Sequence, residues 1–151
     1  MAYAITLHLL AATIWVGGMF FAYMALRPAA AQLLDPPQRL PLWAKTFQRF
    51  FVWVWACVII LPATGYWMVL FIFDGFGHAG IYIHIMHLLG IVMIAIFIFL
   101  YFKPYQGLKR EIDNKDFPQA AKNLNVIRGL IAINLTLGLV TIVIASLGRY
   151  F

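Results

Sequence analysis

Residues 81–102 read IYIHIMHLLGIVMIAIFIFLYF, a stretch without Asp, Glu, Lys or Arg that ends at Lys103 and Pro104. A helix rises about 1.5 Å per residue, so about 20 apolar residues cross the hydrocarbon core of a bilayer. Backbone N–H and C=O groups in lipid must find partners within their own segment. The stretch therefore predicts one transmembrane helix, and it carries His84 and His87 near its start.

Three other stretches share this composition, at residues 1–26, 50–73 and 129–147. Together the four stretches predict an all-α fold, an integral membrane up-and-down four-helix bundle that forms a single domain over residues 1–151. The first stretch has no basic n-region and no small-residue cleavage site. We therefore expect it to be a retained anchor rather than a cleaved signal peptide.

The overall composition supports the membrane class. Hydrophobic residues make up 64% of the chain and charged residues 11%, whereas soluble domains carry about 25% charged residues. The formal net charge is +6, but the basic residues lie between the apolar stretches, where membrane topology accounts for them. We expect the lipid bilayer as partner and no nucleic acid. Cys57 is the single cysteine and allows no internal disulfide.

The loop charges predict an orientation. The loops at 27–49 and 103–128 hold ten of the 11 Lys and Arg residues, and the loop between the second and third stretches holds none. The positive-inside rule places the two basic loops in the cytoplasm and both termini on the periplasmic side. These features predict a multi-pass protein of the bacterial inner (cytoplasmic) membrane.

Two features predict the form of the basic loops. Prolines predict an irregular first loop, and they stand at Pro28, Pro36, Pro37 and Pro41. In the second basic loop, residues 106–125 alternate charged and apolar side chains. This pattern predicts a short amphipathic helix along the cytoplasmic surface.

Three histidines lie inside the apolar stretches, where an ionisable residue suggests a functional site. The first and third spans of an up-and-down bundle run parallel, so His8, His84 and His87 are expected at a similar depth near the periplasmic side. His84 and His87 are three residues apart and share a helix face. The alternative is that each histidine only bonds to a neighbouring helix. His78 is expected to be an ordinary loop residue.

Imidazole suits iron and copper alike. His8 opposite His84 or His87 could clamp the iron of one b-type haem, which is the favoured interpretation. Alternatively, the three imidazoles could hold copper, with Met86 as a thioether ligand. Further methionines could extend a thioether path for Cu(I), or could simply fill the core; they are Met19, Met24, Met68 and Met93.

Other polar or small residues of the spans have two interpretations each. Trp15 follows His8 by seven residues on the same face, and Gly18 could let a haem macrocycle approach. Gly18 could equally serve close helix packing. Pro62 predicts a kink that could line a site. Asn134 is expected to form a hydrogen bond to another helix. No histidine lies in the cytoplasmic half of a span, so a second haem is not expected.

Short motifs in all four spans carry a family resemblance. They are Leu7-His8-Leu9-Leu10 with Trp15, Gly18 and Phe20; Arg49-Phe50 and Thr64-Gly65; Ile83-His84 through His87; and Arg128 with Asn134-Leu135-Thr136-Leu137. With these residues the chain resembles the CopD-like superfamily of four-helix membrane proteins and the related HemJ, a haem-containing protoporphyrinogen oxidase. The resemblance implies a membrane protein that handles copper or binds haem b, with His8 as an axial or metal ligand.

Two departures separate the chain from HemJ. HemJ has a lysine in the third helix where this chain has Met86, and an acidic Asn-Glu element in the fourth helix where this chain has Asn134-Leu135. The resemblance therefore does not carry the oxidase reaction across, although a haem-dependent oxidoreductase remains a hypothesis.

Three functions follow from the sequence. The favoured one is haem binding for redox chemistry or haem handling, with an electron donor or quinone as partner. The alternative is CopD-like copper transport or copper resistance. The third is an accessory subunit without a cofactor, in a homo-oligomer or a larger membrane complex.

Overall fold

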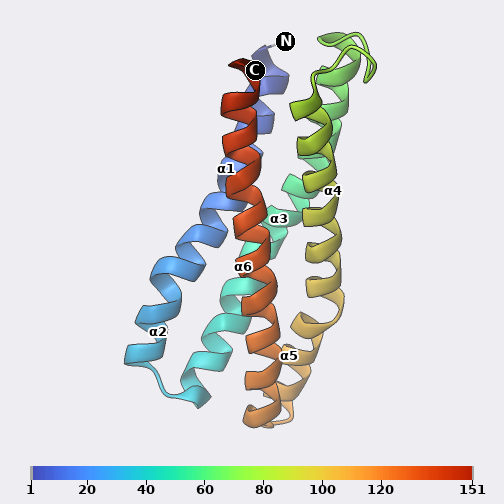
Figure 1. The fold of residues 1–151 in the computed structure, drawn as a ribbon. Helices are drawn as coiled ribbons and strands as arrows, with labels where there is room; N and C mark the ends of the chain where they lie inside the picture. Colours follow the sequence, from blue (N-terminus) through green and yellow to red (C-terminus); the bar gives the residue numbers. More distant parts are fainter. Residues whose placement is uncertain (1, 151) are drawn as a thin grey trace.

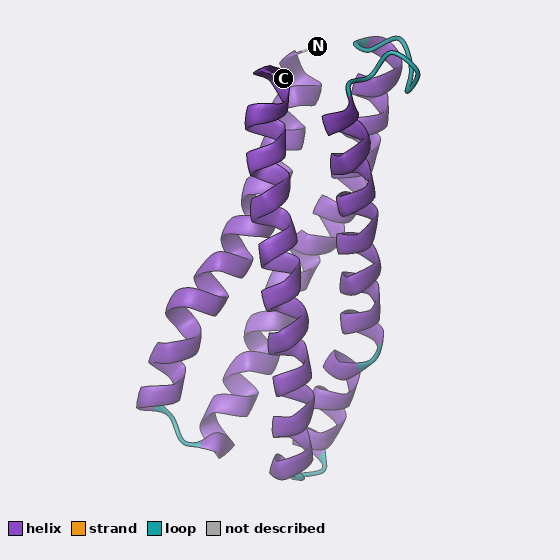
Figure 2. Ribbon diagram, viewed as in Figure 1, coloured by secondary structure: helices purple, strands orange, loops and turns teal. Residues whose placement is uncertain are grey.

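The computed structural model describes residues 2–150, so Met1 and Phe151, the ends of the predicted domain, lie outside the described residues. Within that part of the chain every regular element is helical, and short loops join the helices (Figure 2). The elements are α1 (Ala2–Phe21), the π-helix η1 (Ala22–Leu26), α2 (Arg27–Leu33), α3 (Pro36–Phe71), α4 (Ile81–Phe102), α5 (Pro104–Asp113), α6 (Phe117–Leu147) and the 3-10 helix η2 (Gly148–Tyr150).

The helices combine into four long rods (Figure 1). Each rod is long and apolar enough to cross a membrane, and their limits are Ala2–Leu33, Pro36–Phe71, Ile81–Asp113 and Phe117–Leu147. The predicted all-α class and the four apolar helices are confirmed, and α4 spans the residues predicted for it. Figure 1 also shows that both termini and the α3–α4 loop lie at one end, which we call the termini end. The opposite end, called the basic end, carries the α2–α3 and α5–α6 turns.

The prediction of an irregular first loop is wrong. Helices cover nearly all of 27–49, and only Leu34 and Asp35 separate α2 from α3. Prolines occupy the first turns of both helices. The N–H groups of a first turn have no acceptor within the helix, so proline is tolerated there. α3 also continues through Pro62 without interruption.

The prediction of a surface helix over 106–125 is also wrong. α5 ends at Asp113, and the residues from Phe117 onward belong to α6. α5 packs against α6 and buries Tyr105 and Leu108 in the common core. Its apolar face therefore meets protein rather than lipid, and it prolongs the bundle at the basic end (Figure 1).

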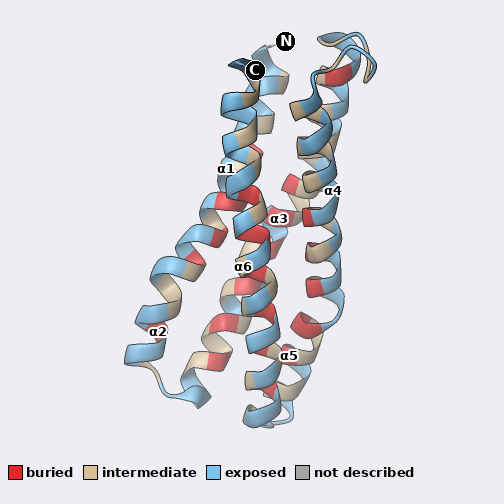
Figure 3. Cartoon of the chain, in the orientation of Figure 1, coloured by how far each residue is buried: buried red, intermediate tan, exposed pale blue. Residues whose placement is uncertain are grey.

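The rods pack in pairs, α1 against α3 and α4 against α6, while α6 also contacts α1 and α3. The predicted bond of Asn134 to another helix is confirmed, because its Nδ2 donates to the carbonyl oxygen of Met93 on α4 at 3.1 Å. Buried residues gather in the middle of the bundle and toward the basic end, whereas residues of the termini end are mostly exposed or intermediate (Figure 3). The core is therefore densest away from the termini end.

Candidate metal site in a cavity of the bundle

A cavity of about 410 Å³ lies between α1, α3, α4 and α6, in the half of the bundle nearer the termini. All four helices contribute to its wall, which is mainly apolar. Its volume falls within the range of about 300–1,000 Å³ typical of ligand sites. Close-packed interiors rarely keep such a space, because unfilled volume costs stability. The cavity is therefore the candidate functional site.

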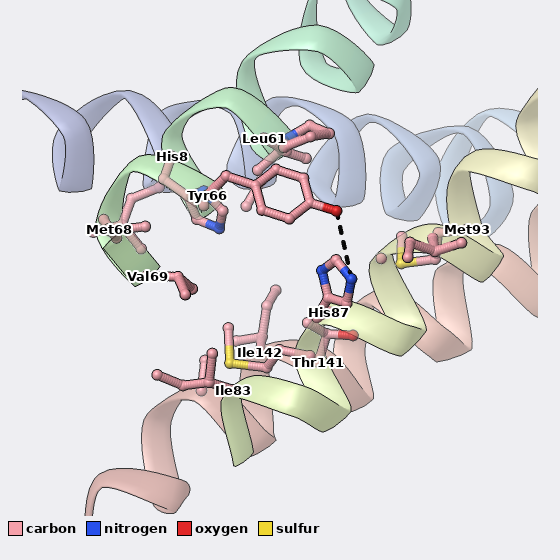
Figure 4. Close-up of a pocket in the computed structure, with 18 of the residues that line it drawn as sticks. His8, Leu61, Tyr66, Met68, Val69, Ile83, His87, Met93, Thr141 and Ile142 are labelled. Carbon is pink, nitrogen blue, oxygen red and sulfur yellow. Dashed lines mark hydrogen bonds between the residues drawn. The ribbon is translucent and has the colours of Figure 1, made fainter. Parts of the chain in front are cut away.

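His8 enters the cavity from α1 (Figure 4). Its Nδ1 lies 2.8 Å from Oγ1 of Thr64 on α3. The Thr64 hydroxyl donates its own hydrogen to the carbonyl oxygen of Ile60, at 2.6 Å. The Thr64 oxygen must therefore accept from His8, which puts the proton on Nδ1 and leaves the Nε2 lone pair free. A hydrogen bond to the nitrogen that does not bind the metal orients a metal-binding imidazole.

The neighbouring residues of α3 shape the wall around His8. Pro62 and Gly65 both line the cavity. A methyl group at Gly65 would lie 3.6 Å from Cε1 of His8, an ordinary contact. A larger side chain at that position would compete with the imidazole for space. The segment from Pro62 to Gly65 thus both holds His8 and leaves room for its ring.

His87 enters the cavity from α4 and faces the same open space as His8 (Figure 4). Its Nε2 lies 3.5 Å from the hydroxyl of Tyr66, at the outer limit of a hydrogen bond. The rings of Tyr66 and Phe76 each have their centroid 5.3 Å from that of His87. His87 is thus held mainly by aromatic packing, and its nitrogens are less committed than Nδ1 of His8.

His84 does not line the cavity. Its Nε2 lies 3.1 Å from the carbonyl oxygen of Phe76, a residue of the α3–α4 loop. The carbonyl can only accept, so His84 donates and fastens the loop to α4. Since Phe76 lines the cavity and packs on His87, His84 secures one wall of the site indirectly.

The predicted convergence of three imidazoles is therefore wrong. No group of three or more His, Cys, Asp or Glu side chains within residues 2–150 is placed to hold a metal ion. His84 turns to the loop because an open backbone carbonyl lies within its reach. His78 is an exposed loop residue whose Nδ1 is 3.2 Å from the carbonyl oxygen of Asp74.

Methionine supplies the other donors of the cavity. The thioether side chains of Met68, Met86 and Met93 line it. Met19, by contrast, is buried in the bundle core, and Met24 is 57% exposed on the outside. The structure thus brings three of the five predicted methionines to the two histidines.

Trp15 and Gly18 have different places. Trp15 lines the cavity and packs edge-on against Phe97, with ring centroids 6.1 Å apart. Gly18 is not part of the cavity wall. A Cβ atom there would collide with the ring of Phe50, so Gly18 serves the close packing of α1 on α3. Its predicted role beside a cofactor is wrong.

Comparison with known proteins identifies the family. A family model described as CopD, copper resistance protein D, matches residues 44–147. The chain belongs to the CopD family. No curated protein and no solved structure matches it.

The CopD match includes most of α3 and all of α4, α5 and α6. It therefore contains Thr64, His87 and the three methionines of the cavity, whereas His8 lies before the matched residues. Within this CopD-family protein the donors fit copper chemically. Imidazole nitrogen binds copper in general, and thioether sulfur selects Cu(I).

Sequence reasoning missed Thr64, Tyr66 and Phe76 as parts of the site. The sequence LPATGY at 61–66 held a signal for Thr64, because a proline, a threonine and a glycine within one membrane helix mark altered packing. Phe76 belongs to a loop, and nothing in its local sequence shows that it folds back onto His87.

Proposed function

We propose that this CopD-family protein handles copper by binding Cu(I) as cargo in the cavity, with His8, His87 and the thioether of Met86 as ligands. The observation that carries the proposal is that two helices, α1 and α4, direct imidazoles into one cavity that three methionines also line. The family name, copper resistance protein D, supports the same chemistry.

The charge of the donor set favours a monovalent ion. Imidazole and thioether ligands are neutral, and the described residues of the cavity wall include no Asp or Glu. A divalent ion in this apolar wall would keep its full charge and a large desolvation cost. Cu(I) carries a single charge and prefers soft ligands. The set therefore suits Cu(I) better than Cu(II) or Zn(II).

The orientation of the protein in the membrane decides from which side copper reaches the cavity. If the basic end faces the cytoplasm, as its arginines and lysines favour, the cavity lies in the periplasmic half of an inner-membrane protein. Copper would then enter from the periplasm, past the α3–α4 loop that His84 holds. The loop residue Phe76 lines the cavity.

A b-type haem is the second candidate, favoured by the volume of the cavity and its apolar wall. His8 and His87 would hold the group, which would supply one-electron chemistry with an electron donor or quinone. One observation disfavours it. Haem carries two propionates, yet no Lys or Arg side chain is found among the described residues of the cavity wall, and a carboxylate in an apolar site needs a partner.

Purified protein in detergent separates these functions. Copper is loaded as Cu(I), excess is removed by dialysis, and the copper content and absorption spectrum are recorded. We expect one copper per chain and no Soret band. A Soret band without copper would establish haem instead. Absence of both, with other membrane subunits co-purifying, would favour the cofactor-free accessory subunit and refute copper handling.

A further inference from the structure

Arg128 on α6 carries two unusual features at the basic end, nearby positive charge and a buried donor without an acceptor. The positive charges of Arg27 on α2 and Arg39 on α3 both act on the guanidinium of Arg128 on α6. Among the side chains that the structure describes, the recorded ion pair is that between Arg110 and Glu111. Arg27 and Arg39 thus each repel Arg128, and no carboxylate among the described residues pairs with these arginines.

Arg128 and Trp43 each have a buried hydrogen-bond donor without an acceptor, Nε of Arg128 and Nε1 of Trp43. Trp43 is 2% exposed. The Arg128 guanidinium lies 5.7 Å from the Trp43 ring centroid, so the two donors are close to each other. Among the described residues, the side chain of Arg128 forms one hydrogen bond, which Nη1 donates to Oδ1 of Asn125 at 3.3 Å. Buried donors of native proteins nearly always have a partner.

The positive-inside rule explains why arginines lie at this end, but it explains neither their convergence nor the unpartnered donors. An anion with several acceptor oxygens would relieve both features. The guanidinium fork matches phosphate in particular. Arg27 is already oriented, since its guanidinium lies 4.8 Å from the ring centroid of Tyr23.

We propose that Arg27, Arg39, Arg128 and the Trp43 indole bind the phosphate of an anionic phospholipid. The chain around the arginines favours a lipid as the source, because Met24 and Leu33 on the same rod are 57% and 80% exposed. Acyl chains can cover such side chains while the headgroup meets the arginines. Basic sites between transmembrane helices on the cytoplasmic side are suited to anionic headgroups. This inference does not depend on the copper proposal, since the cavity lies toward the other end.

Thermal unfolding of the full chain in detergent tests the inference. Phosphatidylglycerol, phosphatidylcholine or inorganic phosphate is added in turn. A ligand that binds only the folded state raises Tm. We expect phosphatidylglycerol to raise Tm by about 5 °C, with little effect of phosphatidylcholine. Stabilisation by inorganic phosphate equal to that by phosphatidylglycerol would overturn the lipid assignment.

Variants define the site. The double variant R27Q/R39Q should lose most of the stabilisation by phosphatidylglycerol. The control K45Q/K122Q removes the same charge from exposed positions of α3 and α6, and it should keep that stabilisation. If both double variants lost the same share of the stabilisation by phosphatidylglycerol, the effect would come from surface charge in general, and the proposal would be overturned.

A milder variant guards against misfolding. Trp43→Phe keeps an aromatic six-membered ring but removes the five-membered ring with the unpartnered Nε1 donor. Tm in phosphatidylcholine should fall, because Trp43 is buried in the core and phenylalanine fills less volume. The increase in Tm from phosphatidylcholine to phosphatidylglycerol should be several-fold smaller than in the wild type. If phosphatidylglycerol stabilised both Trp43→Phe and R27Q/R39Q as much as the wild type, the proposed site would be refuted.

Discussion

The imidazole of His8 on α1 donates from Nδ1 to the hydroxyl of Thr64 on α3, across 2.8 Å. The direction of this bond follows from the bond of the Thr64 hydroxyl to Ile60. It determines which nitrogen of His8 remains free for a ligand. The relationship therefore joins the packing of two helices to the chemistry of the cavity.

Thr64→Val tests this relationship. The variant keeps the shape of the side chain but leaves Nδ1 of His8 without an acceptor. Loss of a hydrogen-bond partner that orients a metal-binding histidine typically costs about 10–100-fold in metal affinity. We expect a loss of this size for Cu(I), measured by competition with a chromophoric chelator.

Thr136→Val is the matched control, because Thr136 is exposed and bonds only to the backbone of its own helix. It should leave the Cu(I) affinity unchanged. Equal affinities of the wild type and Thr64→Val would show that this bond does not prepare a ligand.

Met86→Leu separates copper from haem. The exchange conserves volume and apolarity, so a haem held by two imidazoles should be retained. A Cu(I) site that uses the thioether should lose affinity by about 10-fold or more. Met24→Leu, on the outside of the bundle, serves as control. Unchanged Cu(I) affinity in Met86→Leu would remove this methionine from the ligand set.

His84→Ala tests the role of the α3–α4 loop. The variant removes the bond to the carbonyl oxygen of Phe76 but no group of the cavity wall. We expect the copper content to stay the same while transfer of copper to a chelator becomes about several-fold faster, since the loop opens more readily. His78→Ala should not change the rate. Loss of copper from His84→Ala would instead make His84 a ligand.

Gly18→Ala and Gly17→Ala test the packing of α1 on α3. A Cβ at Gly18 would collide with Phe50, whereas nothing lies within 4 Å of a Cβ at Gly17. Overpacking typically costs about 1–3 kcal/mol. Gly18→Ala should therefore lower Tm in detergent, and Gly17→Ala should not. Phe50→Leu should partly rescue Gly18→Ala, and equal stability of the two alanine variants would contradict the packing.

The length of the four uncharged stretches predicted the four long helices, because a helix needs about 20 apolar residues to cross a bilayer. It did not predict the helices that the basic loops form, α2 and α5. The prolines of the first loop predict an irregular segment, yet most of them stand in the first turn of a helix, where proline is tolerated. The packing of α5 on α6 buries Tyr105 and Leu108, and local sequence does not encode this contact.

Within the site, depth along the helices correctly brought His8 and His87 to one cavity, but depth gives no side-chain direction. His84 differs from His87 only because the α3–α4 loop offers it a carbonyl. Gly18 was ambiguous in sequence, since a flat ligand and a neighbouring helix both require a small residue. Only the position of Phe50 decides between them.

The most direct test of the account is the copper content of His8→Ala/His87→Ala beside that of His78→Ala, after identical Cu(I) loading and dialysis. The account predicts about one copper per chain in the wild type and in His78→Ala, and almost none in the double variant. Copper retained by a folded double variant, or lost equally from His78→Ala, would contradict a copper site in the cavity.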